Sequence, residues 1–461
     1  MLDQKRHVDL LTTFPSLKRL LRSRSFQPGM MLLTLFVFTL VILTGLFGTP
    51  VGSRNFGIIF VWIVWWGLLI IMLVPFLGRF WCSICPIPAP GEWLQRRNII
   101  TKRLPKLRTL NKRWPRQLKN MWLQNFGFLG VALFSVIILT RPQVSAWLLL
   151  SFILLGVVLS VFYKNRVFCR YVCPVGGFIG LYSMVSPLEV RVNDPNVCLT
   201  HTSKDCVTGN EYGYGCPWMV YPGKLNRNID CGMCMECLKT CPKNNIALNM
   251  RPFGTDLTIQ KEHRLDEAYK AFIMLACALV YSVVLLGPWG ELKNAANMQS
   301  IPHWLVYATS FLTFVLVLVP SVFGAFSAAS WLLMKRTLPL RQVFIDFAYT
   351  LVPMGLAAWV AFSLGFVLVN GSYALSVLSD PFGWGWNLFN TVDVPWVPAA
   401  PQLIAFLQTG VLVAGLLFSV QTGYKIAREQ MKLHRKAFAV MLPNSVFLIL
   451  VTLAFMWLYL G

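Results

Sequence analysis

Four cysteines and a proline form the stretch of this chain whose residue types and spacing could do chemistry. Cys231, Cys234, Cys237 and Cys241 are separated by two, two and three residues, and Pro242 follows the last of them. Bacterial ferredoxins use this spacing to hold iron–sulfur clusters, with the fourth cysteine binding a different cluster from the first three. Zinc is the alternative metal, but zinc sites usually consist of two Cys-x-x-Cys pairs far apart in the sequence. The spacing therefore predicts an iron–sulfur site, and with it a part in electron transfer.

Upstream of this ferredoxin run lie candidate ligands with a less regular spacing. They are Cys198, His201, Cys206 and Cys216, the last of which precedes a proline. Cys216 has the form of a crossing cysteine, so one assignment joins it to the first three cysteines of the run. Cys241 would then join Cys198 and Cys206 at a second site, which is one thiolate short. His201 or Asp205 could complete that site, its cluster could contain three irons, or the region could be a lid that binds no metal.

Two shorter motifs occur at matching places among the first four apolar segments. Both are Cys-Pro motifs with a second cysteine upstream: Cys82 with Cys85, and Cys169 with Cys173. Two such hairpins can pack about a pseudo-twofold axis, which would bring four thiolates together for one 4Fe–4S cluster. Three arginines could balance the charge of that cluster: Arg79, Arg166 and Arg170. The alternatives are a redox dithiol, a copper or zinc site, and a structural role.

The composition places these motifs in a membrane protein. Hydrophobic residues make up 56% of the 461 residues and charged residues only 13%, whereas soluble domains contain about a quarter charged residues. Apolar runs of about twenty residues, the length that a bilayer requires, predict nine spans. They are 30–49, 58–78, 121–140, 145–163, 270–288, 304–333, 343–369, 401–424 and 438–460. Pro320 in the sixth span predicts a tilt or kink there.

We therefore expect an all-α polytopic membrane protein of about nine spans with a small α+β ferredoxin-like cytoplasmic insert. The expected domains follow one another along the chain. They are a basic cytoplasmic N-terminal segment (1–28), a four-span duplicated hairpin unit (29–188), a ferredoxin-like iron–sulfur domain (189–265) and a five-span C-terminal membrane domain (266–461).

The distribution of lysine and arginine predicts the orientation. Six of them precede the first span and eleven lie in residues 79–120, whereas the connections on the opposite side contain only Arg54, Arg141 and Lys293. The positive-inside rule then places the N-terminus and the iron–sulfur domain in the cytoplasm and the C-terminus outside the inner (cytoplasmic) membrane. Nucleic-acid binding is the competing explanation for the net charge of +23. Residues 189–270 carry ten basic and ten acidic side chains, so we expect no nucleic-acid partner.

Few ionisable residues lie within the predicted spans. Asp346 is a candidate proton relay, and an interfacial ion pair with Arg341 is the alternative. Of the five histidines only His303 lies near a span, so the sequence excludes a ladder of haems with paired histidine ligands in this subunit. Electrons would need a mobile quinone or another subunit to cross the membrane. The aromatic residues of 62–66 could line a quinone pocket or form an interfacial belt.

In combination, the paired Cys-Pro hairpins and the ferredoxin run resemble the membrane polyferredoxins over residues 30–250. That family includes the quinol-oxidising polyferredoxin subunit of periplasmic nitrate reductase systems, the nitrous oxide reductase accessory protein and the ferredoxin-like assembly proteins of oxidases. The resemblance implies 4Fe–4S clusters and electron transfer between the quinone pool and a partner redox protein. Carried over by position, it implies as ligands Cys82, Cys85, Cys169, Cys173, Cys231, Cys234, Cys237 and Cys241. The chain departs from the family pattern in the two-residue spacing of its first hairpin motif, in its irregular upstream ferredoxin half and in the five spans from residue 270 onward.

We expect an integral membrane iron–sulfur electron-transfer protein with two or three 4Fe–4S clusters, one of which could be a 3Fe–4S or histidine-ligated cluster. It would relay electrons between the quinone pool, or a cytoplasmic donor, and a partner redox enzyme or respiratory complex, as a quinol dehydrogenase does. The expected partners are membrane lipid, a quinone and a redox protein. One alternative is a factor that reduces or delivers copper for a respiratory oxidase or reductase. Another is a membrane scaffold whose cysteines hold zinc.

Overall fold

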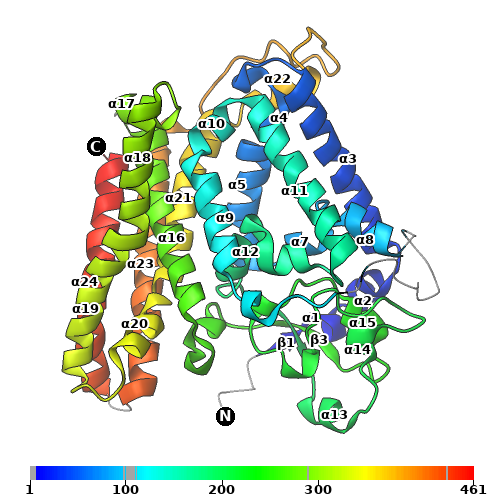
Figure 1. Ribbon diagram of the computed structural model, residues 1–461, viewed down its shortest axis with the longest axis vertical. Helices are drawn as coiled ribbons and strands as arrows, with labels where there is room; N and C mark the ends of the chain where they lie inside the picture. The colour runs from blue at the N-terminus through cyan, green and yellow to red at the C-terminus, as the bar shows by residue number, and fades with distance from the viewer. Residues whose placement is uncertain are drawn as a thin grey trace. The chain divides into compact units, whose positions relative to one another are not determined.

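The computed structural model of the protein is drawn in Figure 1. It describes residues 7–96, 99, 110, 112–287, 290–431 and 434–460. Several basic residues that contribute to the orientation argument lie outside these ranges: Lys5, Arg6, Arg97, Lys102, Arg103, Lys106, Arg108 and Lys432. The chain forms two compact units. The first comprises residues 1–42, 72–124 and 147–256, and the second comprises residues 43–71, 125–146 and 257–461.

Eight helices in the described part of the chain are long and apolar enough to cross a membrane. They are α3 (Phe26–Phe47), Phe56–Leu77, α11 (Pro142–Phe162), Leu265–Leu286, Ile301–Leu333, Leu340–Asn370, α23 (Pro401–Met431) and α24 (His434–Leu460). They support a multi-pass membrane protein, but the predicted number of about nine spans is not confirmed. The predicted span 121–140 consists of α9 (Trp122–Leu133) and α10 (Ser135–Thr140), which meet at Phe134 with φ −98° and ψ 14°. Neither helix alone reaches the length of a span.

The helix over Ile301–Leu333 is irregular where the sequence predicts it. It consists of α18 (Ile301–Thr313), a π-helical segment (Phe314–Leu318) and α19 (Val319–Leu333), and Pro320 is the second residue of α19. Proline has no backbone N–H and its ring clashes with the preceding turn of an α-helix. The wider π-helical turn directly before Pro320 accommodates both effects.

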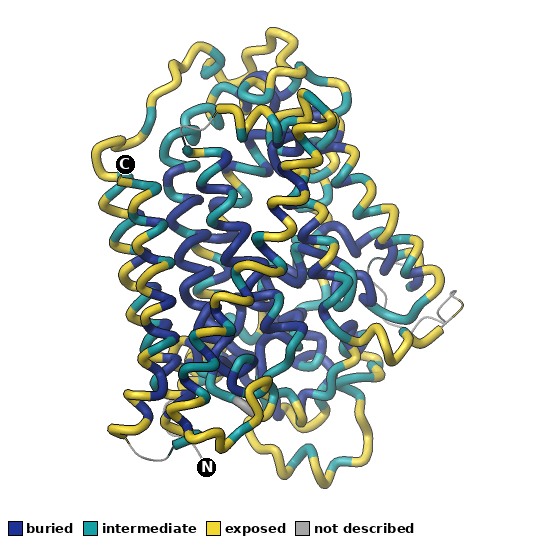
Figure 2. The backbone as a smooth tube through the Cα atoms, turned by 60° about the vertical axis from the view of Figure 1, so that its left-hand side comes forward, coloured by how far each residue is buried: buried dark blue, intermediate teal, exposed yellow. Residues whose placement is uncertain are grey.

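The second unit is a bundle of long helices. Within it α16 (Leu265–Tyr281) packs against α21 (Leu351–Asn370), α21 packs against α23, and α23 packs against α24. A Cβ atom on Gly415 would overlap Ala357, so α21 and α23 approach closely through small residues, as membrane helices commonly do. Figure 2 shows exposed positions recurring along the outward faces of these helices. Many of them are large apolar side chains, such as Phe406, Leu417 and Trp457, which suits contact with lipid.

The first unit contains a three-stranded antiparallel sheet in the order β1-β3-β2. β2 (Leu188–Val192) pairs with β3 (Ile246–Met250), and Val190 lies opposite Leu248. The third strand, β1 (Val8–Asp9), pairs with the other edge of β3. The N-terminal region, which the sequence predicts as a basic cytoplasmic segment, thus contributes a strand to this sheet.

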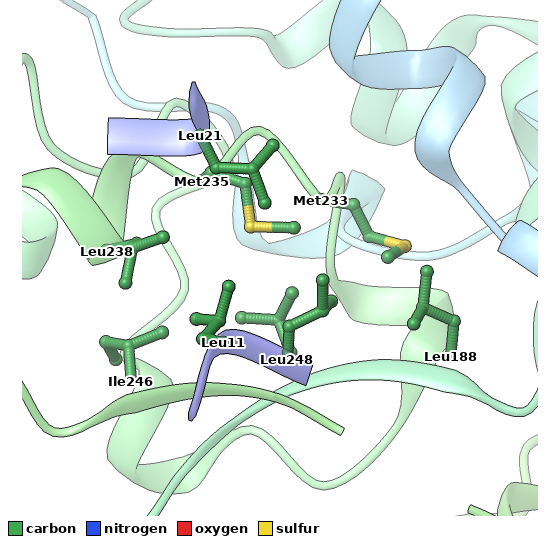
Figure 3. Close-up of a cluster of buried hydrophobic side chains, with 9 residues drawn as sticks. Leu11, Leu21, Leu188, Met233, Met235, Leu238, Ile246 and Leu248 are labelled. Carbon is green, nitrogen blue, oxygen red and sulfur yellow. The ribbon is translucent and has the colours of Figure 1, made fainter. Parts of the chain in front are cut away.

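Nine buried hydrophobic side chains form the core beside this sheet (Figure 3). They are Leu11, Leu21, Leu188, Val190, Met233, Met235, Leu238, Ile246 and Leu248. The first two come from α1 (Leu10–Thr13) and α2 (Pro15–Arg22), and the two methionines come from the ferredoxin run itself. Burial of apolar surface is the main favourable term in folding, so this core fixes the loop that carries the cysteines against the sheet.

Candidate metal centres

The ferredoxin run adopts a backbone conformation that L-residues seldom use. Met233 and Met235, which alternate with the cysteines, have φ angles of 48° and 58°. Such left-handed residues cost energy and persist where the surrounding structure fixes them, commonly around bound ligands. Here the core holds both methionine side chains. The same conformation directs the Met233 N–H toward Sγ of Cys231 at 3.4 Å.

Four thiols line one pocket, and we call them the proximal group. They are Cys216, Cys231, Cys234 and Cys237, the four that the sequence assignment joins. Burial, together with neighbouring thiols, raises the pKa of Cys231 to about 11 and that of Cys234 to about 12. Thiols in this state gain strongly from a cation that stabilises their deprotonated form. Gly232 packs so closely against the ring of Trp218 that a Cβ atom there would overlap it.

Three thiols line a second pocket, and we call them the distal group: Cys198, Cys206 and Cys241. His201 and Asp205 line the same pocket, so the structure brings both candidate fourth ligands to it. Burial and then the two neighbouring thiols raise the pKa of Cys206 to about 11. Asn245 supports the group by placing its N–H 3.3 Å from Sγ of Cys241 and its Nδ2 3.4 Å from Sγ of Cys198. Cys206 also interacts electrostatically with Cys237 of the proximal group.

The two hairpin motifs bring their cysteines together, and we call these four the hairpin group: Cys82, Cys85, Cys169 and Cys173. Burial raises the pKa of Cys85 and of Cys169 well above the ordinary value, and the thiols of the opposite motif contribute to the increase. Both Cys-Pro cysteines end a helix in the extended conformation that a following proline requires, with ψ of 130° at Cys85 and 116° at Cys173.

The unequal spacing of the two hairpin motifs has a structural explanation. Cys82 lies in α7 (Phe80–Ile84), an α-helical turn, whereas Cys169 lies in a π-helical turn (Phe168–Val172). A π-helical turn contains one residue more than an α-helical turn. It therefore absorbs the extra residue of the second motif while the chain still ends on Cys-Pro.

Arginines lie between the hairpin and proximal groups. Arg79 interacts electrostatically with Cys173 of the first group and Cys231 of the second. Its guanidinium lies 4.2 Å from the centre of the Trp218 ring and donates a hydrogen bond of 3.1 Å to the Gly176 carbonyl. Arg79, which the sequence predicts to balance charge at the hairpin cysteines, thus also lies near a thiol of the proximal group.

Arg166 occupies a similar position and has a buried partner. It interacts electrostatically with Cys169 and Cys234, and its Nη1 donates to the Cys82 carbonyl at 2.9 Å. Its Nε and Nη2 donate to the two carboxylate oxygens of Glu92 at 2.6 and 2.8 Å. Arg166 is 4% exposed and Glu92 3%, so this is a buried bidentate ion pair.

Glu92 is a site residue that our sequence analysis missed. Burial alone would raise its pKa, but Arg166, and then Arg96 at 3.6 Å, lower it to about 2. A signal was available, because Glu92 is the single acidic residue in the strongly basic connection 79–120. A lone carboxylate among so many cations indicates a specific partner.

The thiol groups fit iron–sulfur clusters in their donor chemistry. Cysteine thiolates hold such clusters, and hydrogen bonds from N–H groups to the sulfurs tune their reduction potentials. All three groups contain such bonds, including those from Val220 to Cys216 (3.5 Å) and from Gly176 to Cys173 (3.2 Å). Within the described ranges, no three His, Cys, Asp or Glu side chains lie close enough to hold a single metal ion.

Comparison with known proteins supports a 4Fe–4S protein. Residues 58–108 and 145–190 match the family described as a 4Fe-4S binding domain. These two segments contain the two hairpin motifs, which supports the internal duplication. No solved structure matches the chain.

Three curated relatives match parts of the chain. One, from Escherichia coli strain K12, carries the provisional name electron transport protein YccM and is 31% identical over 85 residues, 18% of this chain and 21% of YccM. The chain therefore spans about a fifth of that relative's length. Two uncharacterised proteins of Methanocaldococcus jannaschii are 24% and 23% identical over 225 and 200 residues. Those matches cover 47% and 40% of this chain, and 84% and 76% of the relatives.

Proposed function

We propose that this protein is an integral membrane iron–sulfur electron-transfer protein of the polyferredoxin type. Electrons would pass among the hairpin, proximal and distal groups. The protein would thereby relay electrons between the quinone pool, or a cytoplasmic donor, and a partner redox enzyme. The observation that carries the proposal is the continuity of the three groups. Arg79 and Arg166 each contact electrostatically one thiol of the hairpin group and one of the proximal group, and Cys237 of the proximal group interacts with Cys206 of the distal group.

The ligand assignment that we propose follows these groups. The hairpin and proximal groups each supply four thiolates, as a 4Fe–4S cluster requires. The distal group supplies three, and His201 or Asp205 completes it or a three-iron cluster occupies it. A cluster of this kind, when bound, accepts and donates one electron at a time.

The residues around the groups have separate tasks. The buried arginines offset the negative charge that reduction adds, and Trp218 excludes water between the hairpin and proximal groups. Backbone N–H groups hold four of the sulfurs in position, those of Cys173, Cys216, Cys231 and Cys241. We place the iron–sulfur domain on the cytoplasmic side on the basis of the lysine and arginine distribution.

Anaerobic purification with iron and sulfide analysis, followed by electron paramagnetic resonance after dithionite, tests the proposal. We expect acid-labile sulfide and the signals of reduced clusters. A preparation that contains zinc and no sulfide would contradict it. Reduction of the clusters by a quinol would support the quinone connection. Reduction by a cytoplasmic donor alone, with copper reduced downstream, would favour the assembly alternative.

A further inference from the structure

The second unit contains a line of polar side chains buried inside a membrane helix. Glu267, Lys270, Cys277 and Tyr281 of α16 are spaced by three, seven and four residues, so they lie along one helical face. Lys270 and Cys277 are fully buried, and Glu267 and Tyr281 are 2% and 8% exposed. Ionisable groups within membrane helices are costly to bury and mark ion or proton pathways by default.

One end of this line is a hydrogen-bonded cluster around Asp346. Its carboxylate accepts hydrogen bonds from Nε2 of Gln342 and Nε2 of Gln430, both at 2.8 Å, and Nδ1 of His263 lies at 2.8 Å. The other ring nitrogen of His263 lies 3.1 Å from the Leu257 carbonyl oxygen. Both ring nitrogens therefore face acceptor oxygens, and the contact between Nδ1 and Oδ1 joins the histidine to the carboxylate. The sequence offered a proton relay or an ion pair with Arg341 for Asp346, and the structure places it in this cluster.

Tyr349 joins this cluster to the line on α16. Its ring stacks on the His263 ring with a centroid separation of 3.7 Å, and its hydroxyl donates a short hydrogen bond to the Glu267 carboxylate. The Arg264 backbone N–H donates to the same hydroxyl at 3.0 Å. Tyr349 is therefore held between the His263–Asp346 pair and the first carboxylate of the line. Glu429 of α23 is the further titratable group that interacts with His263.

The line continues toward the other end of α16. Lys270 lies 4.7 Å from the centre of the Phe128 ring. One turn past Cys277, the Tyr281 hydroxyl bonds Ser135. The next residue, Ser282, bonds the Tyr459 hydroxyl at 2.7 Å. At 1.5 Å per residue, Glu267 and Tyr281 are about 21 Å apart along the axis, a large part of the roughly 30 Å hydrocarbon core.

A separate observation indicates water beside this line. Asn125 of α9 is fully buried, and its Nδ2 donates to the Asp266 carbonyl at 2.9 Å. Its Oδ1 has no hydrogen-bond partner among the described residues. Buried polar atoms of this kind are usually satisfied by ordered water, which can carry protons between side chains too far apart to touch.

We propose that the second unit is a proton-conducting module. A proton enters at the His263–Asp346 pair, passes through Tyr349 and Glu267 to Lys270, and leaves along the inward face of α16 through water and the Tyr281 hydroxyl. Only protons move in this step, and the membrane potential drives them. Stability alone does not account for the cluster, because replacing buried ion pairs by apolar side chains is often neutral or stabilising. The inference is independent of the iron–sulfur chemistry proposed for the first unit.

The test uses the full-length protein in vesicles that contain a pH-sensitive dye, with a potassium gradient and valinomycin to impose a membrane potential. Proton uptake is measured with the oxidised and with the dithionite-reduced protein. In at least one of these two states we expect proton uptake to exceed that of protein-free vesicles. Lys270→Met and Glu267→Gln should each slow it by about a hundredfold, the usual contribution of a positioned proton carrier. Glu267→Asp should restore most of it.

Glu291→Gln is the matched control, since it makes the same chemical change at an exposed position of α17 (Gly290–Ala296). It should leave proton uptake unchanged. Two results would overturn the proposal. One is proton uptake no greater than that of protein-free vesicles in both redox states, and the other is equal proton uptake by the wild type and by Lys270→Met. Iron and sulfide are measured on the same vesicles. Their presence or absence tests the electron-transfer proposal, whereas proton uptake tests the proton-conduction proposal, so the two can fail separately. If Lys270→Met does not fold, the comparison of Glu267→Gln with Glu267→Asp decides.

Discussion

The buried pair of Glu92 and Arg166 should dominate the stability of the region between the hairpin and proximal groups. The drop in the Glu92 pKa from 4.5 to about 2 corresponds to roughly 3 kcal/mol of folding free energy at about 1.4 kcal/mol per tenfold change in proton affinity. Breaking a buried pair costs about 3–5 kcal/mol, because the remaining charge loses its partner. We therefore expect Glu92→Gln to lower the free energy of unfolding by about 3 kcal/mol at neutral pH.

The sign of the pH dependence follows from the direction of the pKa change. A carboxylate whose pKa is lowered by folding contributes its full stability above the unfolded value of 4.5 and loses it as the pH falls toward 2. At neutral pH the contribution is complete. Unfolding there should be followed anaerobically in detergent with a chemical denaturant and tryptophan fluorescence.

Matched variants distinguish the contribution of the Glu92–Arg166 pair to stability from general effects of mutation. Glu211→Gln makes the same change at an exposed loop position of the first unit and should alter stability by less than about 0.5 kcal/mol. Glu92→Leu combined with Arg166→Met removes both charges and should recover most of the loss. A coupling energy below about 1 kcal/mol, the value for surface pairs, would refute the reasoning.

Three further predictions concern the cysteine groups. Cys82→Ser and Cys173→Ser should each remove the same cluster, about four iron atoms per chain, and unequal iron losses would argue against a shared site. Arg79→Gln should lower the reduction potentials of the clusters at both the hairpin and proximal groups in an anaerobic redox titration, since it removes a positive charge from between them; a change at one group only would contradict its placement. Gly232→Ala should reduce iron binding by forcing Trp218 aside, whereas Gly130→Ala, with no atom within 4 Å of the added Cβ, should leave the iron content unchanged.

The cysteine groups could be predicted from the sequence because the spacing that marks them lies within short stretches of the chain. The ferredoxin run fixes three ligands within seven residues, and Cys-Pro marks the end of each helix that carries a hairpin pair. The sequence could therefore suggest which cysteines meet. The structure adds that Cys206 of the distal group interacts electrostatically with Cys237 of the proximal group.

Features that depend on distant parts of the chain were not predicted. β1 consists of Val8 and Asp9 only, and its partner strand lies some 240 residues later, so no local pattern marks it. The break at Phe134 lies in a continuous apolar run and has no proline to announce it. The His263–Asp346 pair was missed because His263 precedes α16 and was counted outside the spans. For β1 and for the His263–Asp346 pair the decisive interaction is non-local, whereas propensity and periodicity are local.

The charges between the hairpin and proximal groups explain why a carboxylate is retained there. Arg79, Arg166 and Arg170 together would place three positive charges beside thiolates, and each would raise the potentials of nearby clusters. Glu92 offsets one of them while fixing the Arg166 guanidinium with two hydrogen bonds. That guanidinium then holds the Cys82 carbonyl, so the pair sets both the charge and the geometry of the hairpin group. Apolar side chains in place of Glu92 and Arg166 could give the same folding stability, but they could provide neither the charge nor the hydrogen bonds. This favours a redox role for the pair over a purely structural one.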